Sequence, residues 1–343
     1  MSSQALPLAS ARIAQRRISV IDSHTCGQPT RVICEGVPEF AYTSLAEARE
    51  ILRAEHDWLR TYAVFEPRGH PSLFAAALVP ALDPGCATGV VFMDAAGYPD
   101  MCGHATIGVV TTLVDLGRVS GLDEQVEVAI ETPGGRIETR VTLAGGRAES
   151  VAFVNQPAFF LEAFELAARG ESLAVSVAFG GQWYAFIDPR QLGLAVEPDC
   201  IEELVRAAAE LQPAIAASVG RRDPRSGEAV VVENVMWFDD PVGLAADGRN
   251  MPVNIAGNFD RSPCGTGTSA RLAVLHAAGR LEVGQRYVNS SVLGTTYEAR
   301  ILSTTTIGET TAVVPEITGS AWVTGRAERW AEPTDPLAEG FLL

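Results

Sequence analysis

Two segments of the sequence repeat one another: Cys102-Gly103-His104-Ala105-Thr106 and Cys264-Gly265-Thr266-Gly267-Thr268. Counted from each cysteine, both segments and their continuations have glycine at +1, threonine at +4, leucine at +11, glycine at +15 and arginine at +16. The two cysteines lie 162 positions apart. An internal repeat of this kind indicates two structurally similar units. The sequence therefore predicts a protein of two equivalent halves, each of which carries one thiol.

Two weaker matches keep the order of this repeat. Gly27-Gln28 followed by Val32-Ile33 matches Gly181-Gln182 followed by Phe186-Ile187, at an offset of 154 residues. Gly134 with Glu138, Arg140 and Val141 matches Gly294 with Glu298, Arg300 and Ile301, at an offset of 160 residues. Since three matches in register are improbable by chance, they favour a duplicated unit over an accidental likeness.

Many short β-branched and apolar runs, separated by glycine and proline turns, predict strands with a few helices. The capping box Ser44-Leu45-Ala46-Glu47 predicts a helix that runs to about Arg60. Further helices are expected from Cys102 to Gly117, from about Asp199 to Leu211, and from Cys264 to Gly279, because glycine commonly follows the last residue of a helix. A strand is expected from Val230 to Phe238.

The predicted fold class is α/β (α+β) with two similar halves. We expect residues 18–148 to form the first half and residues 149–317 the second. Residues 318–343 are expected to return to the first half, since a last strand often closes the opposite domain. At 343 residues the chain is long enough for two ordinary domains with a sizeable core.

Composition excludes several classes of partner. The formal net charge is −16, which argues against binding to nucleic acid or to an anionic membrane surface. No stretch approaches the roughly 20 apolar residues of a membrane span. Six cysteines without a C-x-x-C pair favour a reducing compartment. Residues 1–17 contain no apolar segment typical of a secretory signal, so we expect a cytoplasmic protein.

Each repeated cysteine is expected to begin a helix after a strand and a turn. The first turn of a helix has free N–H groups and a partial positive charge, which should lower the pKa of each thiol from its reference of about 8.5. The N–H groups of Gly103 and His104, and of Gly265 and Thr266, should form two anion sites. We also expect the glycine at +1 to let a ligand approach the backbone closely.

This arrangement suits removal of an α-proton next to a carboxylate. If the halves face each other, one carboxylate can bind between both helix ends, and the two sulfurs then flank its α-carbon. Helix N–H groups stabilise the enolate that forms. One cysteine acts as the base and the other, protonated, as the acid on the opposite face, so the configuration inverts.

Other interpretations of the cysteine loops remain open. A cysteine can serve simply as a small buried apolar residue, and a disulfide between Cys102 and Cys264 would block the site. His24, His70, Cys102 and His104 are candidate zinc ligands, although H-E-x-x-H and C-x-x-C spacings are missing. Gly265-Thr266-Gly267-Thr268 has the glycine content of a phosphate loop but lacks the Gly-Lys-Ser/Thr that would follow.

Several motifs resemble those of the proline racemase family, which includes 4-hydroxyproline 2-epimerases and trans-3-hydroxyproline dehydratases. They are Asp22-Ser23-His24-Thr25, Glu66-Pro67-Arg68-Gly69-His70, Met101-Cys102-Gly103-His104, Asp260-Arg261-Ser262-Pro263-Cys264-Gly265-Thr266-Gly267-Thr268 and Pro315-Glu316-Ile317-Thr318-Gly319. The likeness extends from about Ile18 to Phe341. It implies a fold of two α/β halves like that of diaminopimelate epimerase, with the active site in the cleft between them.

The resemblance also implies catalysis without a cofactor or a metal, and often a homodimer. It assigns Cys102 and Cys264 as the acid/base pair. Gly103, His104, Gly265 and Thr266 match substrate-binding positions, and Asp260 matches the carboxylate that meets the ring nitrogen of an imino acid. The partner expected is therefore a small imino acid.

The choice of substrate is expected to depend on a few residues that line the wall of the cleft. Dehydratases of the family generally lack one of the two thiols, so both cysteines favour racemisation or epimerisation. Proline racemases usually have an aromatic residue ten positions before the second cysteine, where this chain has Asn254. A polar side chain there suits a ring hydroxyl, while Phe74 keeps an apolar wall and Trp237 is a further wall candidate. We expect a 4-hydroxyproline 2-epimerase; the alternatives are a proline racemase, a trans-3-hydroxyproline dehydratase and a non-catalytic imino-acid-binding protein.

Overall fold

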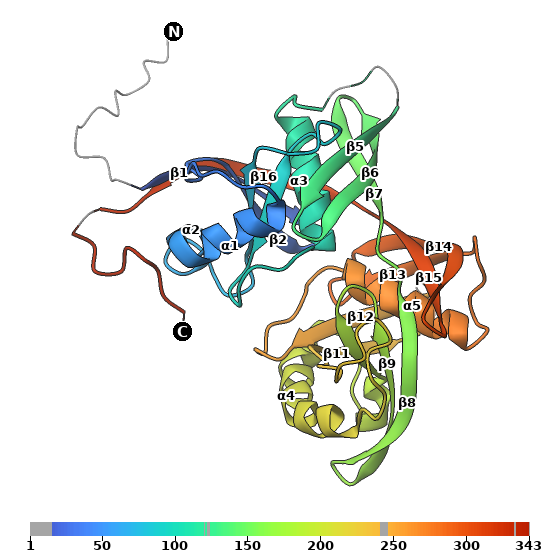
Figure 1. Ribbon diagram of the computed structural model, residues 1–343. Coiled ribbons are helices and arrows are strands. Elements are labelled where there is room, and N and C mark those ends of the chain that lie inside the picture. Colours follow the sequence, from blue (N-terminus) through green and yellow to red (C-terminus); the bar gives the residue numbers. More distant parts are fainter. Residues whose placement is uncertain (1–15, 120, 122–123, 241–245, 333, 343) are drawn as a thin grey trace.

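Sixteen strands join into one continuous sheet in the part of the chain that the computed structural model describes, residues 16–119, 121, 124–240, 246–332 and 334–342 (Figure 1). The strand order is β16-β1-β2-β3-β4-β5-β6-β7-β15-β14-β13-β12-β11-β10-β9-β8. The first eight strands in this order are β16 (Ala321–Trp330), β1 (Arg17–Thr25), β2 (Gln28–Glu35), β3 (Phe74–Val79), β4 (Gly89–Met93), β5 (Gln125–Thr132), β6 (Gly135–Ala144) and β7 (Arg147–Val154). The other eight are β15 (Thr310–Gly319), β14 (Thr296–Ile307), β13 (Arg286–Ser291), β12 (Gly248–Asn254), β11 (Asn234–Asp239), β10 (Trp183–Ile187), β9 (Glu171–Phe179) and β8 (Phe159–Ala168).

The strand order is symmetric about the pairing of β7 with β15. On each side of that pair the same sequence of parallel and antiparallel neighbours recurs. The parallel pairs β2·β3 and β4·β5 of one side correspond to β10·β11 and β12·β13 of the other. The predicted duplication into two similar α/β halves is confirmed, and Figure 1 shows them as two lobes.

The first half takes one edge strand from the C-terminal end of the chain, whereas the second half is built from one continuous segment. After β7 the chain crosses to the second half, where β8 pairs antiparallel with β9 at the outer edge. After β15 it crosses back, and β16 pairs antiparallel with β1 at the outer edge of the first half. The predicted bound at Glu149 falls inside β7.

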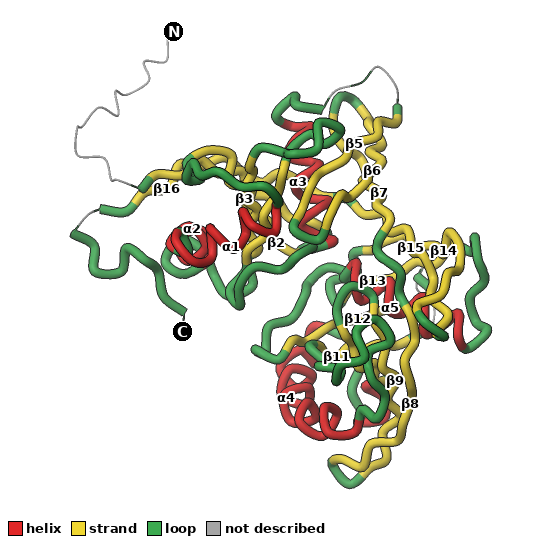
Figure 2. The backbone as a smooth tube through the Cα atoms, viewed as in Figure 1, coloured by secondary structure: helices red, strands yellow, loops and turns green. Residues whose placement is uncertain are grey.

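The two repeated helices are the most deeply buried in the molecule. Helix α3 (Gly103–Asp115) is buried at every residue from Gly103 to Val114 and contacts β1, β2, β7 and β16. Helix α5 (Gly265–Ala277) is its counterpart and contacts β8, β9, β14 and β15. Such all-round burial explains why neither helix shows an amphipathic pattern in the sequence. Figure 2 shows both helices surrounded by strands.

Both helices end in the same way. Gly117 and Gly279 adopt the left-handed conformation, each with φ of 68°. The N–H groups of Arg118 and Arg280 donate to the carbonyls of Leu113 and Leu275, at 2.9 and 2.8 Å. This is the Schellman arrangement in which glycine is favoured because it lacks a Cβ. The helix ends predicted from Gly117 and Gly279 are therefore confirmed.

The outer helices differ from prediction in their bounds. Ser44 caps helix α1 (Leu45–Glu55) as expected, accepting the N–H of Glu47 at 3.1 Å. However, the helix expected to reach Arg60 breaks, and α2 (Trp58–Val64) follows as a separate element. The break occurs where Asp57 is held by Arg60 and Tyr98, at 2.8 and 2.9 Å, and it lets both helices pack into one core. Helix α4 (Ile201–Ser218) is longer than predicted, and β11 begins four residues later than predicted.

Among the described residues, no helix is both long enough and apolar enough to span a bilayer.

Candidate active site

The N-terminal ends of α3 and α5 meet between the two halves. A Cβ added to Gly103 would lie 3.4 Å from Gly265 Cα and 3.0 Å from Cζ of Phe153, and one added to Gly265 would lie 3.2 Å from the same Phe153 atom. Any side chain at these positions would therefore press on Phe153. The glycines leave room for the Phe153 ring beside both helix ends, a reason separate from the predicted close approach of a ligand.

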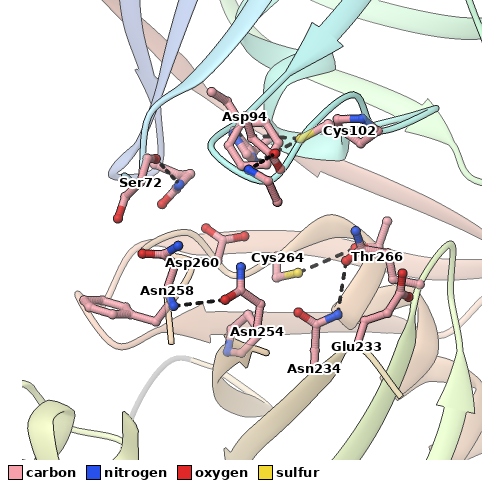
Figure 3. Close-up of a pocket in the computed structure, with 18 of the residues that line it drawn as sticks. Ser72, Asp94, Cys102, Glu233, Asn234, Asn254, Asn258, Asp260, Cys264 and Thr266 are labelled. Atoms are coloured by element: carbon pink, nitrogen blue, oxygen red, sulfur yellow. Dashed lines mark hydrogen bonds between the residues drawn. The ribbon is translucent and has the colours of Figure 1, made fainter. Parts of the chain in front are cut away.

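A cavity of about 250 Å³ opens at this junction. Its lining includes all the predicted acid/base and substrate-binding residues: Cys102, Gly103, His104, Asp260, Cys264, Gly265 and Thr266. Figure 3 shows Cys102 on the wall formed by the first half and Cys264 on the facing wall formed by the second. The two repeated helix ends thus bring their thiols to opposite sides of one cavity.

Cys264 is the N-cap of α5 and is held by several polar groups. Its Sγ accepts the N–H of Gly267 at 3.4 Å, lies 3.4 Å from the Tyr184 hydroxyl and lies 3.7 Å from Thr266 Oγ1. Its backbone has φ of +60°, which is unusual for a residue with a side chain. Strain of this kind persists where surrounding structure holds it and is concentrated at functional sites.

Cys102, the N-cap of α3, has different surroundings. Its Sγ lies 3.3 Å from Nδ1 of His104, and the backbone N–H of Ala105, in the first turn of its own helix, also contacts it. Burial lowers the pKa of His104 to about 3, so that the imidazole is neutral at physiological pH. The edge of Phe74 packs on the His104 ring, with the ring centroids 4.6 Å apart.

The expected lowering of the thiol pKa values is wrong for the cavity as it stands. Burial raises the pKa of Cys264 to about 12, with a further rise from the charge of Asp260. Burial also raises the pKa of Cys102 well above its usual range, and the carboxylates of Asp260 and Asp94 add to this rise. Desolvation of the thiolate therefore outweighs the positive potential of the helix end.

Asp260 is the carboxyl group best placed to meet a cation. It lies in the loop between β12 and α5, and its Oδ1 accepts the N–H of Ser262 at 2.8 Å. Burial raises its pKa to about 6, and the Ser262 hydrogen bonds reduce that rise. Near neutral pH it is therefore an ionised carboxylate that gains from the arrival of a positive charge.

Gln28 and Gln182, which belong to one of the weaker sequence matches between the halves, also line the cavity. Gln28 joins the halves, because its Oε1 accepts the N–H of Arg261 at 3.0 Å and its Nε2 donates to Ser72 O at 2.9 Å. Gln182 Oε1 lies 3.1 Å from the Tyr184 hydroxyl and accepts from Asn234 Nδ2 at 3.2 Å. The Gly-Gln repeat was the available signal for both residues.

The sequence reasoning missed Tyr184, Glu233 and Asn234, which also line the cavity. Tyr184 and Asn234 lie on β10 and β11, and Glu233 precedes β11 and accepts the N–H of Trp183 at 3.1 Å. No repeated motif contains these three residues. The pairing of β10 with β11 brings them to the cavity, where Tyr184 lies beside the thiol of Cys264.

Of the three predicted wall residues, two line the cavity and one does not. Phe74 lines the cavity as expected, and so does Asn254. The Oδ1 atom of Asn254 accepts the N–H groups of Ala256 and Asn258, at 3.0 and 2.9 Å, so only its Nδ2 is left to face the cavity. Trp237 is not a wall residue: it is fully buried in the core of the second half, where its Nε1 donates to Leu204 O at 3.0 Å.

The alternatives based on zinc and on a disulfide receive no support from the geometry. The ring of His24 stacks on Trp322, and His70 is exposed, with its Nδ1 accepting from Ser72 N at 3.3 Å. Among the described residues no three His, Cys, Asp or Glu side chains gather as metal ligands would. All six cysteines, including Cys102 and Cys264, are free, so the predicted alternative of a disulfide is wrong.

The comparisons with known proteins agree on one family. The proline racemase family model matches residues 20–342. The chain is 39% identical to a proline racemase of Clostridioides difficile, over 96% of this chain and 98% of that one. It is 37% identical to a 4-hydroxyproline 2-epimerase of Streptosporangium roseum, over 96% and 99% of the two chains.

Solved structures agree with the sequence comparison. A hydroxyproline epimerase from Agrobacterium vitis, with bound trans-4-hydroxy-L-proline, superposes with a TM-score of 0.85 at 30% identity, over 96% of this chain and 97% of that one. A phenazine biosynthesis protein of the PhzF family from Bacillus anthracis, at 11% identity and a TM-score of 0.62, shares the fold; the match covers 92% of this chain and all of that one.

Proposed function

The chain belongs to the proline racemase family, and on that premise we propose that it inverts the α-carbon of 4-hydroxyproline by proton transfer between Cys102 and Cys264. The observation that carries the proposal is the placement of these two thiols on opposite walls of one cavity, each at the start of a buried helix. The class of reaction is that of an isomerase, as in the curated relatives.

The cavity supplies both charges that a zwitterionic imino acid requires. The free N–H groups at the starts of α3 and α5 donate hydrogen bonds to the carboxylate, since both helices direct their positive ends to the same point. Asp260 takes the ammonium group of the ring. With both ends fixed, the α-carbon lies between the two sulfurs.

Proton transfer then proceeds across the α-carbon. The thiolate of one cysteine removes the α-proton, and the electron pair of the broken C–H bond moves into the carboxylate as an enolate. Helix N–H groups stabilise the developing oxyanion charge, a type of contact worth about 10²–10³-fold in rate. The thiol of the other cysteine donates its proton to the opposite face, and the thiolate moves to that side.

Substrate binding itself makes the thiolate easier to form. The charge of Asp260 raises the pKa values of both thiols in the empty cavity. Once a ring ammonium pairs with that carboxylate, its repulsion of a nearby thiolate is neutralised. Substrate binding thereby offsets part of the rise in the thiol pKa values that burial causes in the free protein.

The choice of 4-hydroxyproline rests on Asn254. Since its Oδ1 holds the loop of residues 254–258, its Nδ2 is the donor left for a ring hydroxyl. A bare ring would leave this amide without a partner at a cost of about 1–3 kcal/mol. The alternative of a proline racemase is favoured by the apolar Phe74 on the other wall and by the similar 39% and 37% identities to the two kinds of relative.

The test compares kcat/KM for trans-4-hydroxy-L-proline and L-proline in deuterated water, with inversion and α-deuteration followed by NMR. We expect the hydroxylated substrate to be favoured, and Asn254→Phe to shift the ratio towards proline by about 5- to 150-fold. Asn254→Asp is the control, because it keeps the acceptor that holds the loop and a group that pairs with a hydroxyl. Loop damage alone would lower both kcat/KM values equally.

A wild-type preference for proline, or an unchanged ratio in Asn254→Phe, would make the proline racemase assignment the better one. If no substrate incorporates deuterium at its α-carbon, the chain is a binding protein without this chemistry. Loss of water from trans-3-hydroxy-L-proline would instead indicate a dehydratase.

A further inference from the structure

We propose that Cys264 is the thiol that ionises first in the substrate-free protein, and that the hydroxyl of Tyr184 holds it in that state. This inference rests on the proposed pairing of Cys102 and Cys264 as acid and base, and it assigns which of them begins as the base. Tyr184 is accordingly a positioning residue that acts through Cys264.

Hydrogen-bond donors converge on Cys264. The backbone N–H of Gly267 donates to its Sγ at 3.4 Å, and the Tyr184 hydroxyl lies at the same distance. A donor that contacts the charged form of a group stabilises that form. Two donors, one from the helix and one from strand β10, therefore favour a thiolate at this position.

The neighbours of Tyr184 direct its single proton. The Tyr184 hydroxyl donates to Gln182 Oε1 at 3.1 Å, an oxygen that also accepts from Asn234 Nδ2 at 3.2 Å, and Thr266 Oγ1 lies 2.6 Å from the Tyr184 oxygen. When Cys264 ionises, its sulfur becomes the strongest acceptor near the tyrosine, and the Thr266 hydroxyl is able to donate to the tyrosine oxygen in turn. Chains of this kind strengthen each hydrogen bond within them.

Cys102 has a backbone donor in Ala105, but the polar side chain beside its sulfur is an imidazole, where Cys264 has the hydroxyl groups of Tyr184 and Thr266. This imidazole, from His104, is neutral and brings no positive charge. Two carboxylates oppose its ionisation, Asp260 from the loop before α5 and Asp94 from the end of β4, whereas Cys264 is faced mainly by Asp260. Each thiol also faces the other, so ionisation of one disfavours ionisation of the second.

The directions of the pKa shifts agree with this geometry. Burial raises the pKa of both thiols, but the Tyr184, Thr266 and Gly267 hydrogen bonds each reduce the rise at Cys264. At Cys102 the reduction comes from the backbone N–H of Ala105 alone. Tyr184 itself keeps its proton, because burial raises its pKa well above the ordinary value.

Alkylation of the resting protein tests the proposal without any substrate. The two cysteine residues are almost equally exposed, at 8% for Cys102 and 7% for Cys264, so overall burial does not favour either one. The thiolate is the reacting form. We would treat the protein with iodoacetamide from pH 7 to pH 10 and follow each cysteine peptide by mass spectrometry.

We expect Cys264 to react about three- to tenfold faster than Cys102 at each pH. One unit of pKa changes the thiolate fraction about tenfold, while the lower intrinsic reactivity of the more acidic thiolate returns part of that factor. Tyr184→Phe should move the pH profile of Cys264 upwards by about one unit and leave Cys102 unchanged. Tyr62→Phe is the matched control, since it removes another buried tyrosine hydroxyl in the outer core of the first half.

Faster alkylation of Cys102 in the wild type would overturn the assignment, and so would a Cys264 profile that Tyr184→Phe leaves in place. The wild-type rates alone decide the first point if the variant does not fold. Because no turnover is measured, the result is separate from the fate of the proposed substrate.

Discussion

Asp260 carries a charge at a position where burial opposes it. Its pKa is raised from 3.8 to about 6, mainly by burial. A carboxyl group whose pKa is raised in the folded state favours folding below its unfolded pKa, and that contribution is lost as the pH rises through the folded value. Ionised Asp260 therefore destabilises the folded protein at the pH where the proposed function needs it.

Replacing this carboxyl should raise stability and remove activity. Asn at position 260 keeps the acceptor for the N–H of Ser262 without the charge. We expect Asp260→Asn to match the wild type in free energy of unfolding near pH 3 and to exceed it by about 3 kcal/mol above pH 7, from about 1.36 kcal/mol per unit of pKa. Urea unfolding at both pH values measures this, and equal stability at pH 8 would contradict it.

Each thiol alone should fail to invert the substrate. Cys102→Ser and Cys264→Ser are expected to lose inversion by about 10²–10⁴-fold, because a serine hydroxyl is too weak an acid to replace the missing partner. The remaining thiol should still exchange the α-proton of one enantiomer with deuterated water. Cys200→Ser is the control, since Cys200 lies at the start of α4 and outside the cavity lining. Inversion near the wild-type rate in either variant would exclude the two-thiol mechanism.

The sequence located the thiols but not their environment. A repeat around Cys102 and Cys264 is visible because both residues lie within continuous motifs. Tyr184 and Glu233 reach the cavity of Cys264 through strand pairing, so no local pattern reveals them. The direction of the thiol pKa shifts was wrong for a related reason: helix position is local, whereas burial is set by the whole fold.

At the scale of elements, the contact between α3 and α5 depends on two residues without side chains. Gly103→Ala would place a Cβ 3.0 Å from Phe153 and at the ordinary contact distance of 3.4 Å from Gly265 Cα, so the Phe153 ring must shift. Overpacking of this kind typically costs about 1–3 kcal/mol. We expect that loss in the free energy of unfolding, with lower kcat because the anion site is built from both helix ends.

A second substitution separates packing from ligand contact. Phe153→Leu removes the ring edge that the new methyl group meets, so it should restore part of the stability in the Gly103→Ala background. The four proteins of this cycle are compared by urea unfolding. Fully additive effects would show that Phe153 is not what the glycine accommodates.

Helix ends were more predictable than helix continuity. Gly117 and Gly279 mark their ends because the left-handed conformation selects glycine. The break after α1 has no such marker, since it follows from contacts of Asp57 with Arg60 and Tyr98 that only the folded chain provides.

At the scale of the whole molecule, a ligand in the cavity connects both halves. Pyrrole-2-carboxylate has a flat α-carbon, as in the enolate, and a carboxylate for the two helix ends. It should raise the free energy of unfolding by about 2.7 kcal/mol at 100 times its Kd, and Tm accordingly. Pyrrole-2-carboxamide, which lacks the negative charge, is the matched control. An unchanged Tm with millimolar carboxylate would contradict the binding mode.

The return of β16 to the first half sets the order in which the chain can finish folding during its synthesis. Strands β8 to β15 are contiguous in sequence, so the second half has all its strands once residue 319 has emerged from the ribosome. The first half begins to emerge much earlier, yet β1 waits for β16, which begins at Ala321. At about 5–20 residues per second, this wait lasts roughly 15–60 s. The half that is made first is therefore the half that is completed last.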